Sequence, residues 1–122
     1  MRLTLKATNI THTNAIDTYV MKRLRELEAV LEPKEKSELA RVDIGMTSTH
    51  HKSGKEVFYA EITFHVKKKD FRAVAKAPDL YAAIDKMRDE IVREVTRHHE
   101  RMRKLQKEGG RELKRRIQKS VR

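Results

Sequence analysis

The chain lacks cysteine entirely, has few aromatic residues and contains no long apolar run. Without cysteine, there is neither a disulfide framework nor a thiolate metal site. No apolar segment approaches the roughly 20 residues that a membrane-spanning helix needs, and no apolar signal core opens the chain. Aromatic residues make up only 5% of the chain, too few for the stacking platform of single-strand binders. These absences predict a cytoplasmic protein without a membrane partner.

Basic side chains are abundant and unevenly distributed along the 122 residues. Lys and Arg number 29 against 18 Asp and Glu, a formal net charge of +11. Residues 1–100 carry 19 basic and 16 acidic groups and net +3, whereas residues 101–122 carry 10 and 2 and net +8. A strongly basic tail suits a polyanion, because each neutralised phosphate releases a counterion. Nucleic acid is therefore favoured over a merely solvated tail, with a membrane surface third.

Four strands are predicted from apolar side chains that alternate with polar ones. The alternation covers residues 1–8, 41–46, 58–66 and 71–77, and a period of two is typical of half-buried strands. Polar residues 50–55 predict a turn between the second and third strands. Lys67-Lys68-Lys69-Asp70 predicts a basic hairpin loop, which either touches RNA or keeps an edge hairpin from aggregating.

Two amphipathic helices are predicted from apolar residues at helical spacing. The first begins after Thr13, a suitable N-cap, and is expected to end at Pro33. Its apolar stripe consists of Ile16, Val20, Leu24, Leu27 and Leu31. The second begins after Asp79 and is expected to break at Gly109-Gly110. Its stripe consists of Leu80, Ile84, Met87, Ile91, Val95, His98, Met102 and Leu105.

The predicted elements follow the order β-α-β-β-β-α, which indicates a single α+β domain. The first strand, helix and second strand can form a crossover between parallel neighbours, and the next two connections are hairpins. Both helices are expected to pack on one face of a four-stranded sheet. The domain is predicted to span residues 1–106. Residues 107–122 form a basic tail that is expected to be disordered alone and able to become helical on RNA.

A short motif at the start of the second helix carries a family resemblance. The segment Asp79-Leu80-Tyr81-Ala82-Ala83-Ile84-Asp85 resembles the one that opens the second helix of the ribosome hibernation promoting factor family, which includes the ribosome-associated inhibitor A proteins. The first helix also agrees with this family, at Asn9-Ile10, Thr13, Ala15-Ile16, Tyr19-Val20, Arg23-Leu24 and Leu27-Glu28. The resemblance covers about residues 1–105 and is to the short members.

This resemblance implies both a fold and a function. The fold is the same β-α-β-β-β-α arrangement with two helices on one face of four strands. The function is binding of the small ribosomal subunit through ribosomal RNA at the decoding region, which blocks the messenger and transfer RNA sites under stress or in stationary phase. Long members add a domain that pairs ribosomes, so a ribosome-pairing protein is a further candidate partner here. No cofactor and no small-molecule substrate are expected.

Basic side chains on the two helices are the predicted RNA-binding residues. Arg23, Arg93 and Arg97 resemble positions that are basic in the family, whereas Glu26 and Glu90 stand where members usually carry basic residues. Rows of cations along a helix position a protein on RNA without reading its bases. The predicted set is Lys22, Arg23, Arg25, Lys86, Arg93, Arg97, Arg101 and Lys104.

Three other interpretations stay open at this point. The helix face is solvated and neutral if its interleaved acids pair with Arg93 and Arg97. A generic double-stranded RNA binder is a second interpretation, although such a domain begins with a helix. The third is a metal-dependent nuclease. Against catalysis, there is no nucleophile motif or phosphate-binding glycine loop, and His98 lies on the apolar stripe, where it is predicted to pack. The chain is therefore predicted to have neither metal nor enzymatic activity.

Overall fold

The computed structural model describes residues 1–47 and 57–120, so the turn predicted at residues 50–55 lies outside the described residues. The elements in chain order are β1 (Arg2–Thr8), α1 (Asn14–Glu28), α2 (Pro33–Lys36), β2 (Leu39–Met46), β3 (Phe58–Val66), β4 (Lys69–Ala77) and α3 (Leu80–Ser120). Within the described ranges, no helix is both long and apolar enough to cross a bilayer.

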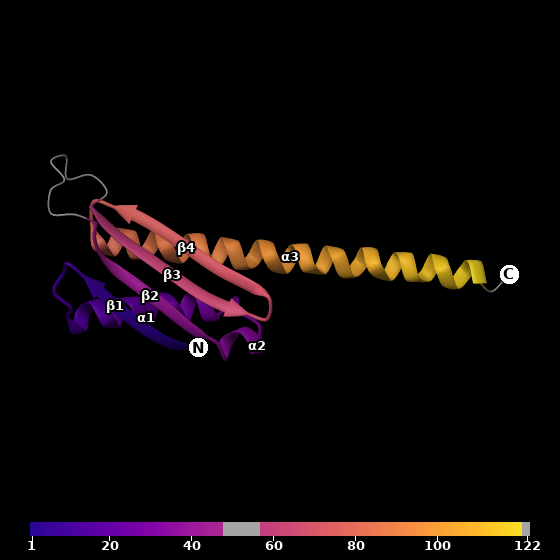
Figure 1. Ribbon diagram of the computed structural model, residues 1–122, viewed down its shortest axis with the longest axis horizontal. Coiled ribbons are helices and arrows are strands. Elements are labelled where there is room, and N and C mark those ends of the chain that lie inside the picture. The colour runs from indigo at the N-terminus through magenta and orange to yellow at the C-terminus, as the bar shows by residue number, and fades with distance from the viewer. Residues whose placement is uncertain (48–56, 121–122) are drawn as a thin grey trace.

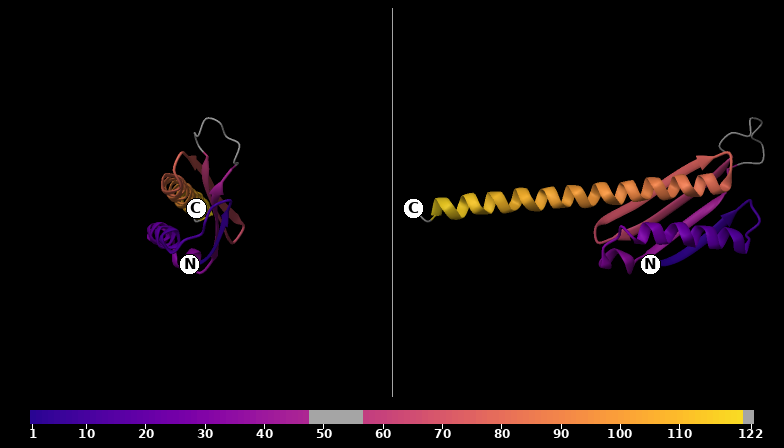
Figure 2. Two further views of the ribbon diagram at one scale, coloured as in Figure 1. Left: turned by 90° about the vertical axis from the view of Figure 1, so that its left-hand side faces the viewer. Right: turned by 180° about the vertical axis from the view of Figure 1, so that it is seen from behind.

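The four strands form one mixed sheet in the order β1-β2-β3-β4. Strand β1 is parallel to β2, and the remaining neighbours are antiparallel. Figure 2, seen end on, shows α1 and α3 side by side on one face of this sheet, with the other face uncovered. The predicted α+β fold is thereby confirmed, and the two helices share the face that the apolar alternation predicts.

The core lies between this sheet face and the two helices. The first predicted stripe is buried from Ile16 to Leu31, and the second is buried from Leu80 to Val95. The end of the second predicted stripe is not buried, because Met102 and Leu105 lie beyond the sheet and are exposed. Both helices begin where expected, because the side chain of Thr13 accepts a hydrogen bond from the Ile16 amide at 3.2 Å. Asp79 likewise accepts one from the Ala82 amide at 3.1 Å. These caps satisfy amide groups that have no partner within the helix.

The prediction that Pro33 ends the first helix is wrong. Helix α1 ends at Glu28, and Pro33 instead begins the short helix α2. Proline suits a first helical position, because that residue's amide would have no helical partner. The Glu35 side chain then accepts from the Glu32 amide at 2.7 Å and completes a capping box.

The predicted break at Gly109-Gly110 is also wrong. Helix α3 continues through both glycines to Ser120, so residues 107–120 are helical in this structure. It is about 60 Å long at 1.5 Å per residue, and it projects far beyond the sheet (Figure 1). A glycine costs a helix only about 1 kcal/mol relative to alanine. Glu112 offsets part of that cost through ion pairs with Arg115 and Arg116.

The basic hairpin is tighter than the sequence predicts. Val66 is paired with Lys69, so only Lys67 and Lys68 form the turn and β4 begins at Lys69. Lys67 has φ of 54°, in the left-handed region that a residue with a Cβ enters at a cost of about 1–2 kcal/mol.

A network of polar side chains joins α1 to α3 above the core. The Tyr19 hydroxyl donates to Asp85 at 2.6 Å and accepts from Arg23 at 3.1 Å. Arg23 also bonds Glu26 at 2.6 Å, and its Nε lies 2.9 Å from Asp85 as an ion pair without hydrogen-bond geometry. Arg88 of α3 donates to the other oxygen of Glu26. Glu26 therefore bridges two arginines from different helices.

This bridging lowers the pKa of the Glu26 carboxyl, chiefly through the hydrogen bond from Arg88 and further through Arg23. A carboxyl whose pKa is depressed by folding stabilises the protein at pH values above its unfolded pKa. That contribution disappears as the pH falls through the lowered, folded-state pKa.

Gly45 of β2 lies directly against the backbone of β1. It is paired with Thr8, and a Cβ at this position would lie 2.0 Å from the Thr8 carbonyl oxygen. Because that oxygen belongs to the backbone of a paired strand, it cannot move aside. Gly109 provides a contrast, since nothing lies within 4 Å of its Cβ position.

The change Gly45→Ala is expected to destabilise the protein by about 1–3 kcal/mol, the range typical of overpacking. Urea unfolding followed by circular dichroism measures the loss. The control Gly109→Ala should leave the stability of the sheet unchanged and increase helicity. Equal midpoints for Gly45→Ala and the wild type would contradict the close approach of β1.

The change Glu26→Gln is expected to lower the melting temperature at pH 7, because the bridging carboxylate is lost. The difference from the wild type should shrink as the pH falls through the lowered, folded-state pKa of Glu26. Thermal unfolding across an acidic pH series measures it. Glu100→Gln is the control, because Glu100 is exposed and has no ion pair among the described residues. A pH-independent difference would show that the charge of Glu26 is not what matters.

Candidate nucleic-acid interface

Four of the predicted cations form a row along the outer side of α3. Lys86, Arg93, Arg97 and Lys104 are separated by seven, four and seven residues, which keeps them on one side of a helix. All four are exposed, and they lie opposite the buried stripe. We call these four residues the helix row. Arg101 is also exposed, one turn beyond Arg97.

Two of the acids interleaved with the helix row, Asp89 and Glu94, are engaged elsewhere, whereas Glu90 and Glu100 are exposed and form no ion pair among the described residues. Asp89 bonds Arg88 at 2.7 Å, and Glu94 lies 3.8 Å from the Lys69 ammonium group. Among the described residues, Arg93 and Arg97 form no ion pair at all. The predicted alternative of a self-neutralised helix face is therefore not what the structure shows.

Arg72 of β4 joins this surface, which the sequence did not predict. A shallow hollow of about 230 Å³ between β4 and α3 is lined by Arg72, Arg93 and Arg97, together with Glu90 and Glu94. Arg72 is exposed and bonds Glu61 at 2.9 Å. Only the folding of β4 against α3 brings these three guanidinium groups to one hollow, so no spacing in the sequence indicates it.

The helix row also continues past the body of the protein. Arg111 and Arg115 follow Lys104 at intervals of seven and four residues, and both are exposed. These residues were missed because the helix was expected to break before them. The signal available in the sequence was the net charge of the tail, +8 for residues 101–122.

The three predicted cations of α1 separate into two groups. Lys22 and Arg25 are exposed on its outer side. Arg23 is half-buried in the network between the helices, where its guanidinium lies 4.9 Å from the Tyr19 ring centre. The hydrogen bond with Tyr19 raises the pKa of Arg23 further above its ordinary value. The structure thus places Arg23 between the helices rather than on their outer surface.

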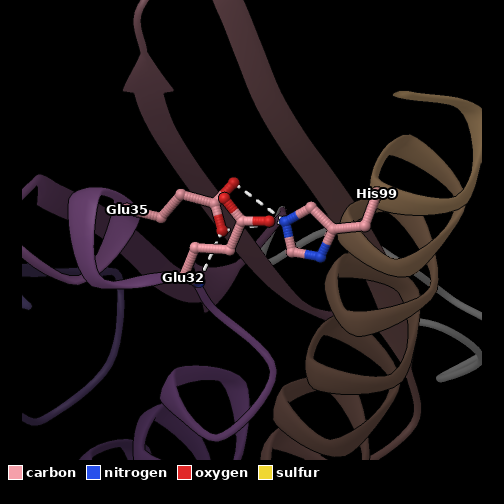
Figure 3. A group of neighbouring side chains, drawn as sticks. All are labelled: Glu32, Glu35 and His99. Carbon is pink, nitrogen blue, oxygen red and sulfur yellow. Dashed lines mark hydrogen bonds and ion pairs between the residues drawn. The ribbon is translucent and has the colours of Figure 1, made fainter. Parts of the chain in front are cut away.

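The histidines of α3 have different environments. His98 packs edge-on against the Phe71 ring, with centres 5.2 Å apart, and burial lowers the pKa of its imidazole. The prediction that His98 is a packed residue is confirmed. His99 instead points toward α2, where its Nε2 lies 2.9 and 3.0 Å from the two oxygens of Glu35 (Figure 3).

Glu32, Glu35 and His99 form a group of metal-ligand types that the sequence did not reveal. One ligand atom from each lies within 4.8 Å of the others, although 64 residues separate Glu35 from His99. Because a carboxylate can only accept, the Nε2 of His99 donates to Glu35. Glu35 is buried and also accepts from the Glu32 amide. The hydrogen bonds between His99 and Glu35 thus hold α2 against α3.

Comparison with known proteins gives the same family at the levels of sequence and structure. Residues 3–103 match the family described as Sigma 54 modulation protein / S30EA ribosomal protein. The ribosome hibernation promoting factor of Salmonella typhimurium is 28% identical over 102 residues, which cover 84% of this chain and 97% of that protein.

Two solved structures share the fold. The N-terminal domain of Thermus thermophilus Protein Y superposes with a TM-score of 0.63 at 29% identity, covering 80% of this chain and 99% of that one. A ribosomal subunit interface protein from Coxiella burnetii gives 0.64 at 11% identity, covering 81% and 98%, and supports the fold alone. The family match spans the sheet, α1 and the part of α3 that packs on them, so this chain belongs to the Sigma 54 modulation protein / S30EA ribosomal protein family.

Proposed function

We propose that this protein is a ribosome hibernation factor that binds the small ribosomal subunit through ribosomal RNA. The related Salmonella protein is named a ribosome hibernation promoting factor, and the Coxiella protein a ribosomal subunit interface protein. Binding at the decoding region, as the family resemblance implies, would occlude the sites of messenger and transfer RNA. The activity is occlusion rather than catalysis, and it belongs to stress or stationary phase in the cytoplasm.

The observation that carries this proposal is the helix row, in which Lys86 donates to the Lys76 carbonyl oxygen at 3.3 Å and the two arginines lack ion pairs among the described residues. Arg93 and Arg97 have no ion pair among the described residues, so binding a phosphate breaks no internal contact. Side chains at intervals of seven and four residues present several cations to one RNA surface. The flat, exposed row has no aromatic side chain that could stack on a base, which favours recognition of a folded backbone over a base sequence.

The proposed site consists of the exposed cations on the outer sides of both helices. On α3, these are the helix row and Arg101, extended by Arg111 and Arg115; on α1, they are Lys22 and Arg25. Arg23 contributes indirectly, because its network holds α1 beside α3 and so sets the spacing between the two sets of cations. In this proposal, residues 1–106 form the ribosome-binding domain and residues 107–122 form a basic tail, of which residues 107–120 are a helical arm.

The double change Arg93→Glu and Arg97→Glu is expected to abolish co-sedimentation with purified small subunits at physiological salt. The neutral pair Arg93→Gln and Arg97→Gln should reduce the slope of log affinity against log salt by about 1.4–1.8, at roughly 0.7–0.9 per phosphate. Arg2→Gln with Arg41→Gln is the matched control, because both side chains are exposed on the sheet and lack ion pairs among the described residues.

Two outcomes would contradict the proposal. If the variant with Arg93→Glu and Arg97→Glu still co-sediments with the small subunit at physiological salt, the helix row is not the interface. Equally tight binding of the wild type to free duplex RNA, measured by gel shift, would favour a generic double-stranded RNA binder. That function uses the same phosphate contacts but has no preference for the ribosome.

A further inference from the structure

A cleft of about 620 Å³ lies at the end of the sheet, under the part of α3 that projects past the body. Three elements far apart in sequence form it: α2, the β3–β4 hairpin and the segment of α3 around residues 98–106. His98, Met102 and Gln106 line it and continue the side of α3 that is buried farther back. The cleft therefore lies on the sheet side of α3, opposite the helix row.

The rim of this cleft is strongly cationic. Its lining includes five basic side chains, Lys34, Lys67, Lys68, Lys69 and Arg103, against two acidic ones, Glu32 and Glu35. The excess is three positive charges (5 − 2), with the histidines neutral. These cations come from three elements, so they surround the cleft rather than follow one helix. We call this feature the basic cleft.

Most of these cations are free to bind a ligand. Lys69 lies 3.8 Å from Glu94 and stands over the Phe71 ring at 5.6 Å, so it is partly committed to the fold. Lys34, Lys67, Lys68 and Arg103 form no ion pair with any described residue. All four are exposed.

The acidic side chains do not neutralise the rim. Glu35 is buried, and its carboxylate is held by His99 and by the Glu32 amide (Figure 3). It is therefore turned toward α3 and satisfied there, away from the hairpin tip. Glu32 alone remains as an exposed carboxylate beside the cleft.

The tip of the β3–β4 hairpin carries adjacent positive charges at positions where tight turns usually have other residue types. Two-residue hairpin turns favour glycine or asparagine at positions with positive φ. Here Lys67 occupies such a position at 54°, followed directly by Lys68 and Lys69. Three adjacent ammonium groups repel one another, and a bound anion would relieve that repulsion.

We propose that the basic cleft is a second RNA-binding site, which takes backbone phosphates of a different RNA segment from the one on the helix row. The proposal rests on the proposed function. Lysine is a compact point charge that suits phosphate. The two surfaces lie on opposite sides of α3, whose diameter with side chains is about 10–12 Å. A straight stretch of backbone cannot contact both sides of the helix, so in this proposal the protein lies between two RNA segments and binds both.

An acidic protein segment is the competing occupant, and the charge pattern disfavours it. Val66 and Phe71 at the floor are buried, so Met102 is the main exposed apolar side chain of the lining. A peptide gains specificity from pockets or grooves for its apolar side chains. The described lining instead offers one large exposed apolar side chain and cations from three elements.

The first test compares full-length variants for binding to purified small subunits across a salt series. Lys67→Gln with Lys68→Gln is expected to weaken binding several-fold and to reduce the salt slope by about 1.4–1.8. Its effect should add to that of Arg93→Gln/Arg97→Gln, because separate sites act independently. Arg2→Gln/Arg41→Gln removes the same charge from the open sheet face and should have little effect.

The outcomes separate the two proposals. If Lys67→Gln/Lys68→Gln behaves like Arg2→Gln/Arg41→Gln while Arg93→Gln/Arg97→Gln loses affinity, the basic cleft is overturned and the proposed function stands. If all three pairs bind like the wild type, the proposed function fails first. If poly-glutamate binds the wild type but not Lys67→Gln/Lys68→Gln, and ribosome affinity is unchanged, the cleft is an acidic-protein site and the RNA assignment is wrong.

The second test exploits the absence of cysteine from the chain. Gln106→Cys lines the basic cleft and Thr96→Cys lies beside Arg93 and Arg97, and neither change removes a cation. An iron chelate tethered at each position cleaves nearby RNA in the complex. We expect two separate sets of cuts in ribosomal RNA. A single shared set, or no cuts from Gln106→Cys, would overturn the proposal of two RNA segments. Inorganic phosphate at matched ionic strength should not reduce the cuts; if it does, the cleft binds free phosphate instead.

Discussion

Burial of the apolar stripe of α3 against the sheet is the constraint on which the rest of the structure depends. Leu80, Ile84, Ile91 and Val95 are each at most 7% exposed, and burying such a side chain contributes about 1.5–3 kcal/mol. Once this stripe is fixed on the sheet, every other residue of α3 has a defined direction. One flank faces α1, the other faces β4, and the outer side faces solvent.

Charge pairing within that frame decides which cations remain available. On the flank facing α1, Arg88 is held by Glu26 and Asp89, and Arg23 is held by Tyr19, Glu26 and Asp85. On the flank facing β4, Glu94 turns to Lys69. Glu26 thus helps join the two helices. On the outer side, Asp89 and Glu94 have partners other than Arg93 and Arg97, whereas Glu90 forms no ion pair among the described residues.

The projecting half of α3 follows different physics from the half on the sheet. From Glu100 to Ile117, every described side chain is exposed, including Met102, Leu105 and Leu113. No core stabilises this arm, so backbone hydrogen bonds and pairs such as Glu112 with Arg116 carry its helicity. The arm carries further cations on its outer side, and its first part lines the basic cleft. Both proposed RNA surfaces therefore depend on α3 continuing as one helix beyond the body.

The sequence by itself determined the α+β class, the strand alternation, both helix caps and the family, because these depend on periodicity and local hydrogen bonds. It also indicated the helix row, since four cations at intervals of seven and four residues share a side of any helix. It misjudged Pro33 and Gly109-Gly110, where local propensity allowed either a helix or a break. Only tertiary structure decided that Arg23 is enclosed, that Arg72 joins Arg93 and Arg97, and that Glu35 meets His99. The residues brought together in this way lie 21 to 64 positions apart along the chain. Spacing along the chain does not indicate which distant residues will meet.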